Sequence, residues 1–179
     1  MSDIKTLLDE TPFQTAGPFL HIGCLPNAIN IEGVFDKDLG VKPFANKNYD
    51  KFITIVGSVF DGDGKALDDI MLETWQSDEN GVYSPDCGFA RFVPDSLTKK
   101  FNLYTLKPGF VSNIDGKAQS PHILISISSR GLNMTLNTRI YFEGDDLIND
   151  PLLSTIKNSR NDISSLVAKK IDEDIYLFD

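Results

Sequence analysis

Runs of β-branched and aromatic residues, separated by short stretches of turn residues, constrain the fold of this chain more than any other feature. The run Phe52–Phe60 is rich in such residues, and Asp61–Gly64 after it supplies residue types that tolerate positive φ. The next run, Ile70–Gln76, is followed by an Asn80-Gly81 turn. The sequence therefore predicts a hairpin whose strands are 52–60 and 70–76.

Similar runs recur along the chain, whereas helical signals are rare. Asn149–Ile156 is the best helix start, because a capping residue precedes Pro151 at the first helical position. Residues 1–50 show little periodicity, so we expect an N-terminal arm with loops that belongs to the same domain as the β-sandwich of residues 51–179. The expected fold is all-β: a single-domain β-sandwich with an extended arm and one short helix. The other predicted strands are Phe101–Leu106, His122–Ser128, Thr138–Phe142 and a late pair, Leu166–Lys169 and Ile175–Phe178.

Composition narrows the class of protein. The chain has 179 residues, enough to bury one full core. Its formal charge of -9 argues against nucleic-acid and anionic-membrane surfaces, which leaves small molecules or proteins as the expected partners. No apolar run is long enough to span a bilayer and no secretory signal is visible, so a cytoplasmic location is expected. Cys24 and Cys87 are isolated and are expected to be reduced packing residues.

Seven strings, in order along the chain, resemble the alpha-type chains of the intradiol ring-cleaving dioxygenase family. The resemblance implies a β-sandwich in which alpha and beta chains pair, and in which the beta chain binds a ferric ion through two tyrosines and two histidines. The strings are Thr11–Phe19 with His21-Ile22-Gly23, Glu73–Tyr83, Thr105–Gly109, Pro121-His122-Ile123, Ser129-Arg130-Gly131, Thr138–Phe142 and Leu166–Lys169.

The positions that match the family's metal ligands are altered. The tyrosine that follows the Lys-Pro-Gly turn is Val111 here, and the family's His-x-His is His122 followed by Leu124. The arginine three residues before the first histidine is Gln119. Valine and leucine have no lone pair to donate, so the resemblance implies no metal ligand and no catalytic residue in this chain. The ferric ion is expected in the partner beta chain, and Tyr83 cannot be assigned to the remaining ligand position.

The resemblance also implies substrate-binding residues that an alpha chain contributes to its partner's active site. These are Thr15, Gly17 and Pro18 in the arm and Arg130. Arginine suits a catechol that carries a carboxylate, because its planar fork donates two hydrogen bonds. Arg130 is alternatively a surface or ion-pair arginine before the Gly131 turn. For His122, a hydrogen-bonded and partly buried histidine is the expectation, because a lone imidazole on a strand has no chelating partner.

The expected function is therefore that of an alpha chain that works beside an iron-bearing beta chain in a hetero-oligomer, which opens the ring of protocatechuate with dioxygen. Two alternatives remain: a non-enzymatic assembly or binding module that kept the fold, and a self-sufficient catechol dioxygenase with an altered site. The chain departs from the family in a short connection between Tyr83 and Phe101. It also stops at Asp179 where the family pattern continues with strand, which is expected to uncover a sheet edge or leave space for a partner's strand.

Overall fold

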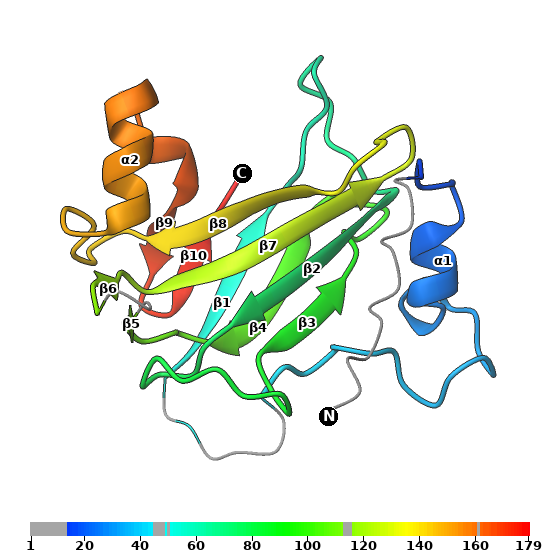
Figure 1. The fold of residues 1–179 in the computed structure, drawn as a ribbon. Coiled ribbons are helices and arrows are strands. Elements are labelled where there is room, and N and C mark those ends of the chain that lie inside the picture. The colour runs from blue at the N-terminus through cyan, green and yellow to red at the C-terminus, as the bar shows by residue number, and fades with distance from the viewer. Residues whose placement is uncertain (1–13, 45–48, 50, 113–115, 161) are drawn as a thin grey trace, which may run out of the picture.

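The computed structural model describes residues 14–44, 49, 51–112, 116–160 and 162–179, and these form a β-sandwich (Figure 1). The helical elements are α1 Leu20–Cys24, α2 Pro151–Arg160 and two 3-10 turns, Asn27–Ile29 and Ser164–Leu166. The strands are β1 Phe52–Gly57, β2 Ile70–Gln76, β3 Phe89–Phe92, β4 Phe101–Leu106, β5 Val111–Ser112, β6 Ala118–Gln119, β7 His122–Ser129, β8 Leu136–Phe142, β9 Val167–Asp172 and β10 Ile175–Leu177.

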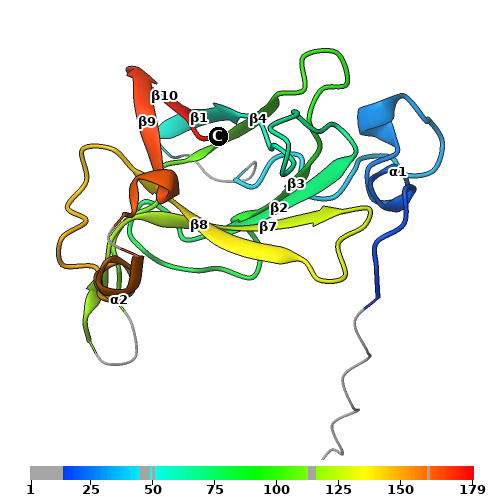
Figure 2. The same cartoon turned by 90° about the horizontal axis from the view of Figure 1, so that it is seen from above.

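Eight of these strands form one folded-over sheet in the order β3-β2-β7-β8-β9-β10-β1-β4, and β5 pairs with β6 separately. Figure 2 shows the two layers that result, with β2, β7 and β8 below and β1 and β4 above. The antiparallel pair β9 and β10 joins the layers along one side. The predicted β-sandwich is therefore confirmed.

The core lies between the layers and follows from the two-residue period of the strands. Ile53 and Ile55 of β1 are buried, as are Ile123 and Ile125 of β7, and all four belong to one apolar cluster. Because side chains alternate along a strand, His122 and Leu124 lie on the opposite, outer face of the β7 layer. That outer face carries the two positions that match the family's His-x-His, whereas Val111 lies on β5 in the separate two-stranded sheet.

The predicted hairpin between residues 52–60 and 70–76 is wrong as a pairing of strands. β1 pairs with β4 and β10, whereas β2 pairs with β3 and β7, so the two runs lie in different layers. Only the tip is closed, by a bridge between Phe60 and Ala66 and a hydrogen bond from the Leu67 amide to the Val59 carbonyl. Each run buries one face, and the two buried faces pack against each other across the core. The backbone of each strand can therefore hydrogen-bond to other strands of its own layer.

The remaining predicted strands appear within a few residues of their expected ends, and the late pair is an antiparallel pair as expected. The short β3 lies in the connection between Tyr83 and Phe101, where no strand was expected. β10 is not an uncovered edge, because it lies between β9 and β1. Within the described ranges, no helix combines the length and apolar character that crossing a membrane requires.

Helix α2 is confirmed at the predicted start. The carboxylate of Asp150 accepts hydrogen bonds from the amides of Leu152 and Leu153 at 2.9 Å, so Asp150 is the cap ahead of Pro151. α1 is an additional short helix within the arm, and residues 1–13 of the arm lie outside the described residues. Both cysteines are free thiols, as predicted.

Candidate functional site

Strand register brings a row of side chains together on the outer face of the β2-β7-β8 layer. Leu124 lies opposite Trp75 of β2 and Arg139 of β8, and His122 lies opposite Tyr141. This is the face on which a His-x-His pair would grip one metal ion, because residues two apart on a strand share a face. The structure therefore shows what the altered positions do instead.

His122 is a buried, hydrogen-bonded histidine, as predicted. His122 is only 2% exposed, and its Nδ1 lies 2.8 Å from the Ser120 carbonyl oxygen. A carbonyl can only accept, so Nδ1 carries the proton. Burial lowers the pKa of His122, although the hydrogen bond to Ser120 acts in the opposite direction. The imidazole is therefore neutral near pH 7.

A chain of polar contacts surrounds His122. Nη1 of Arg139 donates to Oε1 of Gln119 at 2.8 Å and to the Tyr141 hydroxyl at 3.3 Å. Burial raises the pKa of Tyr141, so the phenol stays protonated and can donate to Asp150, 3.5 Å away. Asp150 also accepts from the Ser120 amide at 2.9 Å. These contacts tie β6, β8 and the start of α2 to the strand that carries His122.

The residues at the family's metal position do not fit a ferric ion. Val111 is 8% exposed and is paired with Gln119 in the β5-β6 ribbon, and Leu124 stands beside His122. Across the described ranges, no group of three or more histidine, cysteine, aspartate or glutamate side chains could hold a metal ion. Ferric sites need anionic oxygen and imidazole donors, and the side chains of Val111 and Leu124 offer neither. Tyr83 instead stacks on Trp75, with ring centroids 6.1 Å apart.

A second candidate surface lies at the turn between β7 and β8, where the arm meets the sandwich. The Thr15 hydroxyl donates to Oδ1 of Asn133 at 2.5 Å, and the Ala16 amide donates to the Leu132 carbonyl at 3.4 Å. The same turn carries Arg130. The structure thus brings Thr15 to the turn of Arg130, two positions that are more than 100 residues apart.

Arg130 forms an ion pair with a partner that the sequence did not identify. Its Nε lies 2.6 Å from Oδ2 of Asp69, which immediately precedes β2, while the Arg130 side chain is 66% exposed. Within the described part of the chain, Asp69 is the acidic residue within ion-pair distance of Arg130. Gly17 and Pro18 are exposed and lead into α1, where the Gly17 carbonyl accepts from the Leu20 amide.

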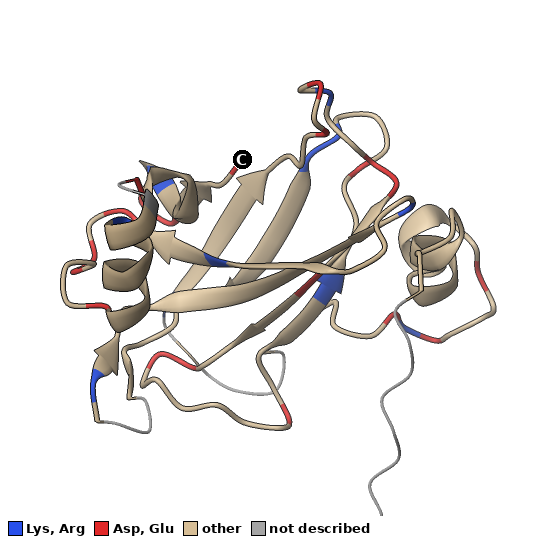
Figure 3. Cartoon of the chain, turned by 45° about the horizontal axis from the view of Figure 1, so that its top comes forward, with Lys and Arg blue, Asp and Glu red and all other residues tan. Residues whose placement is uncertain are grey.

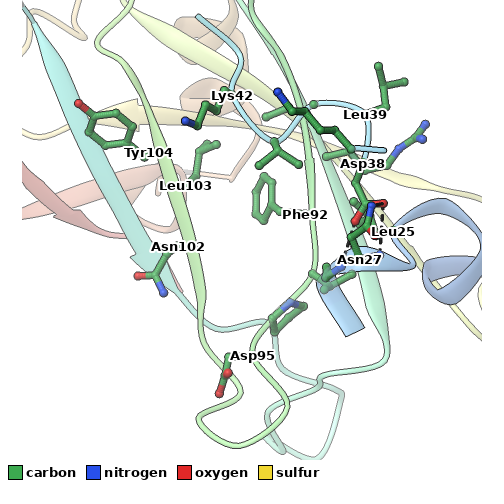
Figure 4. Close-up of a pocket in the computed structure, with 18 of the residues that line it drawn as sticks. Leu25, Asn27, Asp38, Leu39, Lys42, Phe92, Asp95, Asn102, Leu103 and Tyr104 are labelled. Carbon is green, nitrogen blue, oxygen red and sulfur yellow. Dashed lines mark hydrogen bonds between the residues drawn. The ribbon is translucent and has the colours of Figure 1, made fainter. Parts of the chain in front are cut away.

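A larger cavity, of about 1030 Å³, lies away from both surfaces, between β3, β4 and residues 25–42 of the arm (Figure 4). Leu25, Phe92 and Leu103 contribute apolar surface to it. Asp38 holds the arm segment closed by accepting from the Ala28 amide at 3.0 Å. None of Thr15, Gly17, Pro18 and Arg130 is among its lining residues.

Acidic residues lie mainly in the loops and turns, whereas Lys and Arg occur both in loops and on strands (Figure 3). The site residues could be predicted from short stretches of sequence, but the residues that contact them could not. Asp69 and Asn133 were missed because each contacts its partner only through tertiary structure. Arg139 lies within the string Thr138–Phe142, and its position opposite Leu124 was available only once the register of β7 and β8 was known.

Comparisons with known proteins agree with this architecture. The Dioxygenase family profile matches residues 28–173. The protocatechuate 3,4-dioxygenase alpha chain of Pseudomonas putida is 36% identical over 190 aligned residues, covering 97% of this chain and 91% of the relative. The corresponding alpha chain of Burkholderia cepacia is 31% identical and covers 92% and 86%.

Solved structures show the same fold at lower identity. The dioxygenase domain of a dioxygenase carbohydrate-binding protein fusion from Streptomyces sp. SirexAA-E superposes with a TM-score of 0.60 at 19% identity, covering 94% of this chain and 96% of that domain. Catechol 1,2-dioxygenase from Pseudomonas arvilla C-1 superposes with a TM-score of 0.61 at 18% identity, covering 78% and 54%. With the family profile and the alpha-chain relatives, this likeness leads to one conclusion: the chain belongs to the intradiol dioxygenase family.

Proposed function

We propose that this chain is the alpha subunit of a protocatechuate 3,4-dioxygenase. It works beside a beta chain that binds the ferric ion, and the assembly cleaves protocatechuate with dioxygen to 3-carboxy-cis,cis-muconate. The observation that carries the proposal is that the chain keeps the family's fold without the family's metal ligands. Leu124 stands beside His122, and Val111 replaces a tyrosine. Iron chemistry therefore belongs to the partner.

The contribution of this chain is a surface that completes the partner's substrate pocket. Arg130 supplies a permanent positive charge for the substrate carboxylate, and Asp69 engages the guanidinium through Nε. That ion pair leaves the Nη edge open for a bidentate contact with a carboxylate. Thr15, Gly17 and Pro18 form the adjacent arm, which Asn133 anchors to the same turn.

Sequence likeness over almost the whole chain supports the paired assembly. Two relatives that cover more than nine-tenths of this chain are named as alpha chains. We infer a hetero-oligomer of alpha and beta chains, of higher order, in the cytoplasm, with no nucleic-acid or membrane partner. In this proposal the arm of residues 1–50 and the sandwich of residues 51–179 act as parts of one domain.

Co-purification tests the proposal. The chain carries an affinity tag and is expressed together with the reading frame beside its own gene. We expect a second polypeptide to be retained in equal amount, to contain iron, and to carry the tyrosine and His-x-His ligands that are absent here. Recovery of the chain alone, soluble and without an iron-containing companion, would support the binding-module alternative and contradict the subunit proposal.

A further inference from the structure

A second cavity, of about 570 Å³, lies on the outer face between β7, β8 and the segment that contains α2. Its apolar wall comes from Leu124 on the sheet and from Leu152 and Ile156 on α2. Arg139 and Tyr141 line the sheet side as polar groups. The cavity is therefore mixed, because Asn137, Thr138, Ser159, Asp162 and Ser165 also line it. Small-molecule sites combine apolar surface of this kind with placed polar groups.

Arg139 differs from the other partly buried cations of the sandwich. Arg91 lies 2.6 Å from Glu73, and Lys107 lies 2.8 Å from Asp145. Within the described residues, no carboxylate comes within ion-pair distance of Arg139, whose hydrogen-bond acceptors are the neutral oxygens of Gln119 and Tyr141. A partly buried cation without an anion is unfavourable, so this guanidinium is suited to an anion from outside the chain.

The remaining donors of Arg139 define the shape of that anion. Both contacts in the structure use Nη1, which leaves Nε and Nη2 to bind a carboxylate in the paired geometry that guanidinium favours. Leu124, Leu152 and Ile156 then offer apolar surface to the body of the ligand. The chemistry is that of a small carboxylate with an apolar body.

The one acid that lines this cavity limits the charge of the ligand. The carboxylate of Asp162 accepts hydrogen bonds from the Ser164 amide at 2.8 Å and the Ser164 hydroxyl at 3.0 Å. Its negative charge disfavours a second charge on the ligand, so a dianion such as phosphate is a poor occupant. A monoanion is the better match for one guanidinium.

We propose that the cavity between β7, β8 and α2 is a binding site for a small monocarboxylate with an apolar body, with Arg139 as its anchor. Arg130 is not among the residues that line this site, and every residue of the proposed site belongs to this chain. The site uses the position of Leu124, where the family's second histidine ligand is lost, as an apolar wall.

Titration of the full chain with benzoate tests this proposal, with benzamide as a neutral ligand of nearly the same shape and inorganic phosphate as a dianion. Trp75 is the sole tryptophan and lies opposite Leu124, so its fluorescence reports binding, and calorimetry gives the stoichiometry. We expect one benzoate per chain, and affinity at least tenfold weaker for benzamide and for phosphate.

Two variants separate recognition from folding. Arg139→Gln is expected to weaken benzoate binding at least tenfold, whereas Arg91→Gln, which removes an arginine already paired with Glu73, is expected to leave it unchanged. Leu124→Trp fills the cavity while keeping Arg139, and is expected to abolish binding even if Arg139→Gln fails to fold. Its binding is measured by calorimetry, because it adds a second tryptophan. Equal affinity for benzoate and benzamide, or unchanged binding in folded Arg139→Gln or Leu124→Trp, would overturn the proposal.

Discussion

His122 holds one ring nitrogen in a hydrogen bond, and its neighbour on the same strand face, Leu124, cannot ligate a metal. Nδ1 donates its proton to the Ser120 carbonyl, so the lone pair is on Nε2. Carbonyls fix metal-binding histidines in the same tautomer. With Leu124 beside it, the imidazole acts as a buried structural group. The sequence was sufficient to predict this role, because the loss of chelation is visible in the residue types alone.

Burial of His122 leads to a prediction about pH. The pKa of His122 is lowered on folding, so below its ordinary pKa the unfolded chain binds a proton at His122 more readily than the folded chain does. Stability is therefore lost as pH falls from about 6.5, the ordinary histidine pKa, towards the folded pKa, at up to about 1.4 kcal/mol per pH unit. His122→Gln removes this component, so the difference in unfolding free energy between wild type and variant should shrink as pH falls. A pH profile of His122→Gln identical to that of the wild type would contradict the account.

Arg130 carries the prediction for substrate recognition. If Arg130 holds the substrate carboxylate, Arg130→Ala should raise the KM of the mixed complex for protocatechuate by the equivalent of about 1–3 kcal/mol, the range for a lost charge-assisted hydrogen bond. Plain catechol lacks the carboxylate and should be affected much less. Steady-state kinetics on both substrates, with iron content and assembly checked, decides the matter. Equal losses on both would reduce Arg130 to the surface ion-pair arginine that its contact with Asp69 also permits.

At the scale of elements, α2 begins where its capping residue predicts, and Asp150 explains why. This carboxylate is 1% exposed and serves two elements: one oxygen caps α2, and the other accepts from the Ser120 amide beside β6. Local sequence was enough for the cap. The contact with Ser120, 30 residues away, depends on tertiary structure and could not be predicted.

Removing the Asp150 carboxylate should therefore cost more than an ordinary cap. Asp150→Ala is expected to lower the free energy of unfolding by about 2–4 kcal/mol, because it leaves buried amides of α2 and Ser120 without acceptors. Urea unfolding followed by circular dichroism measures this. Asp162→Ala, at an exposed carboxylate that caps the Ser164 turn, serves as the control and should cost much less. Equal small losses in both variants would show that the Ser120 contact adds no stability.

Strand pairing was the part of the fold that residue patterns could not supply. The turn at Asp61–Gly64 was predicted, but a turn of this type closes a hairpin or leads the chain to the opposite layer equally well. Which outcome occurs depends on where β4, β7 and β10 lie, since these strands take the pairing edges of β1 and β2. β3 was missed because four residues are too few to show alternation.

The arm is an element whose contacts predict a role in association. Thr15 and Ala16 attach it to the β7-β8 turn, while Phe19, Val34 and Phe35 remain 73%, 56% and 48% exposed in the chain alone. Deleting residues 1–19 should weaken binding to the beta chain, because it removes this attachment and the Phe19 side chain. Sedimentation velocity of the mixture measures the change, and Asn133→Ala should shift it in the same direction by less. A complex of unchanged stability after truncation would show that the arm has no part in assembly.

At the scale of the whole molecule, the sandwich carries two separate groups of polar contacts. On the outer face of the β7 layer, Ser120 links His122 to Asp150, and Arg139 links Gln119 to Tyr141, which donates to Asp150. At the β7-β8 turn, the Arg130 side chain is 66% exposed, and the arm meets the same turn through Thr15 and Ala16. Fold class and family could be predicted from strings spread over the chain, whereas the pairing of Arg130 with Asp69 and the placing of Arg139 opposite Leu124 depended on the topology.

Ring cleavage by separated and recombined chains tests the central claim most directly. The alpha chain, the beta chain and their mixture are each supplied with protocatechuate and dioxygen, and loss of substrate is followed by absorbance. We predict no turnover by the alpha chain alone, whose Val111 and Leu124 positions offer no ligands, and full activity only in the mixture. Ring cleavage by the alpha chain alone, or a beta chain equally active on protocatechuate without it, would contradict the account.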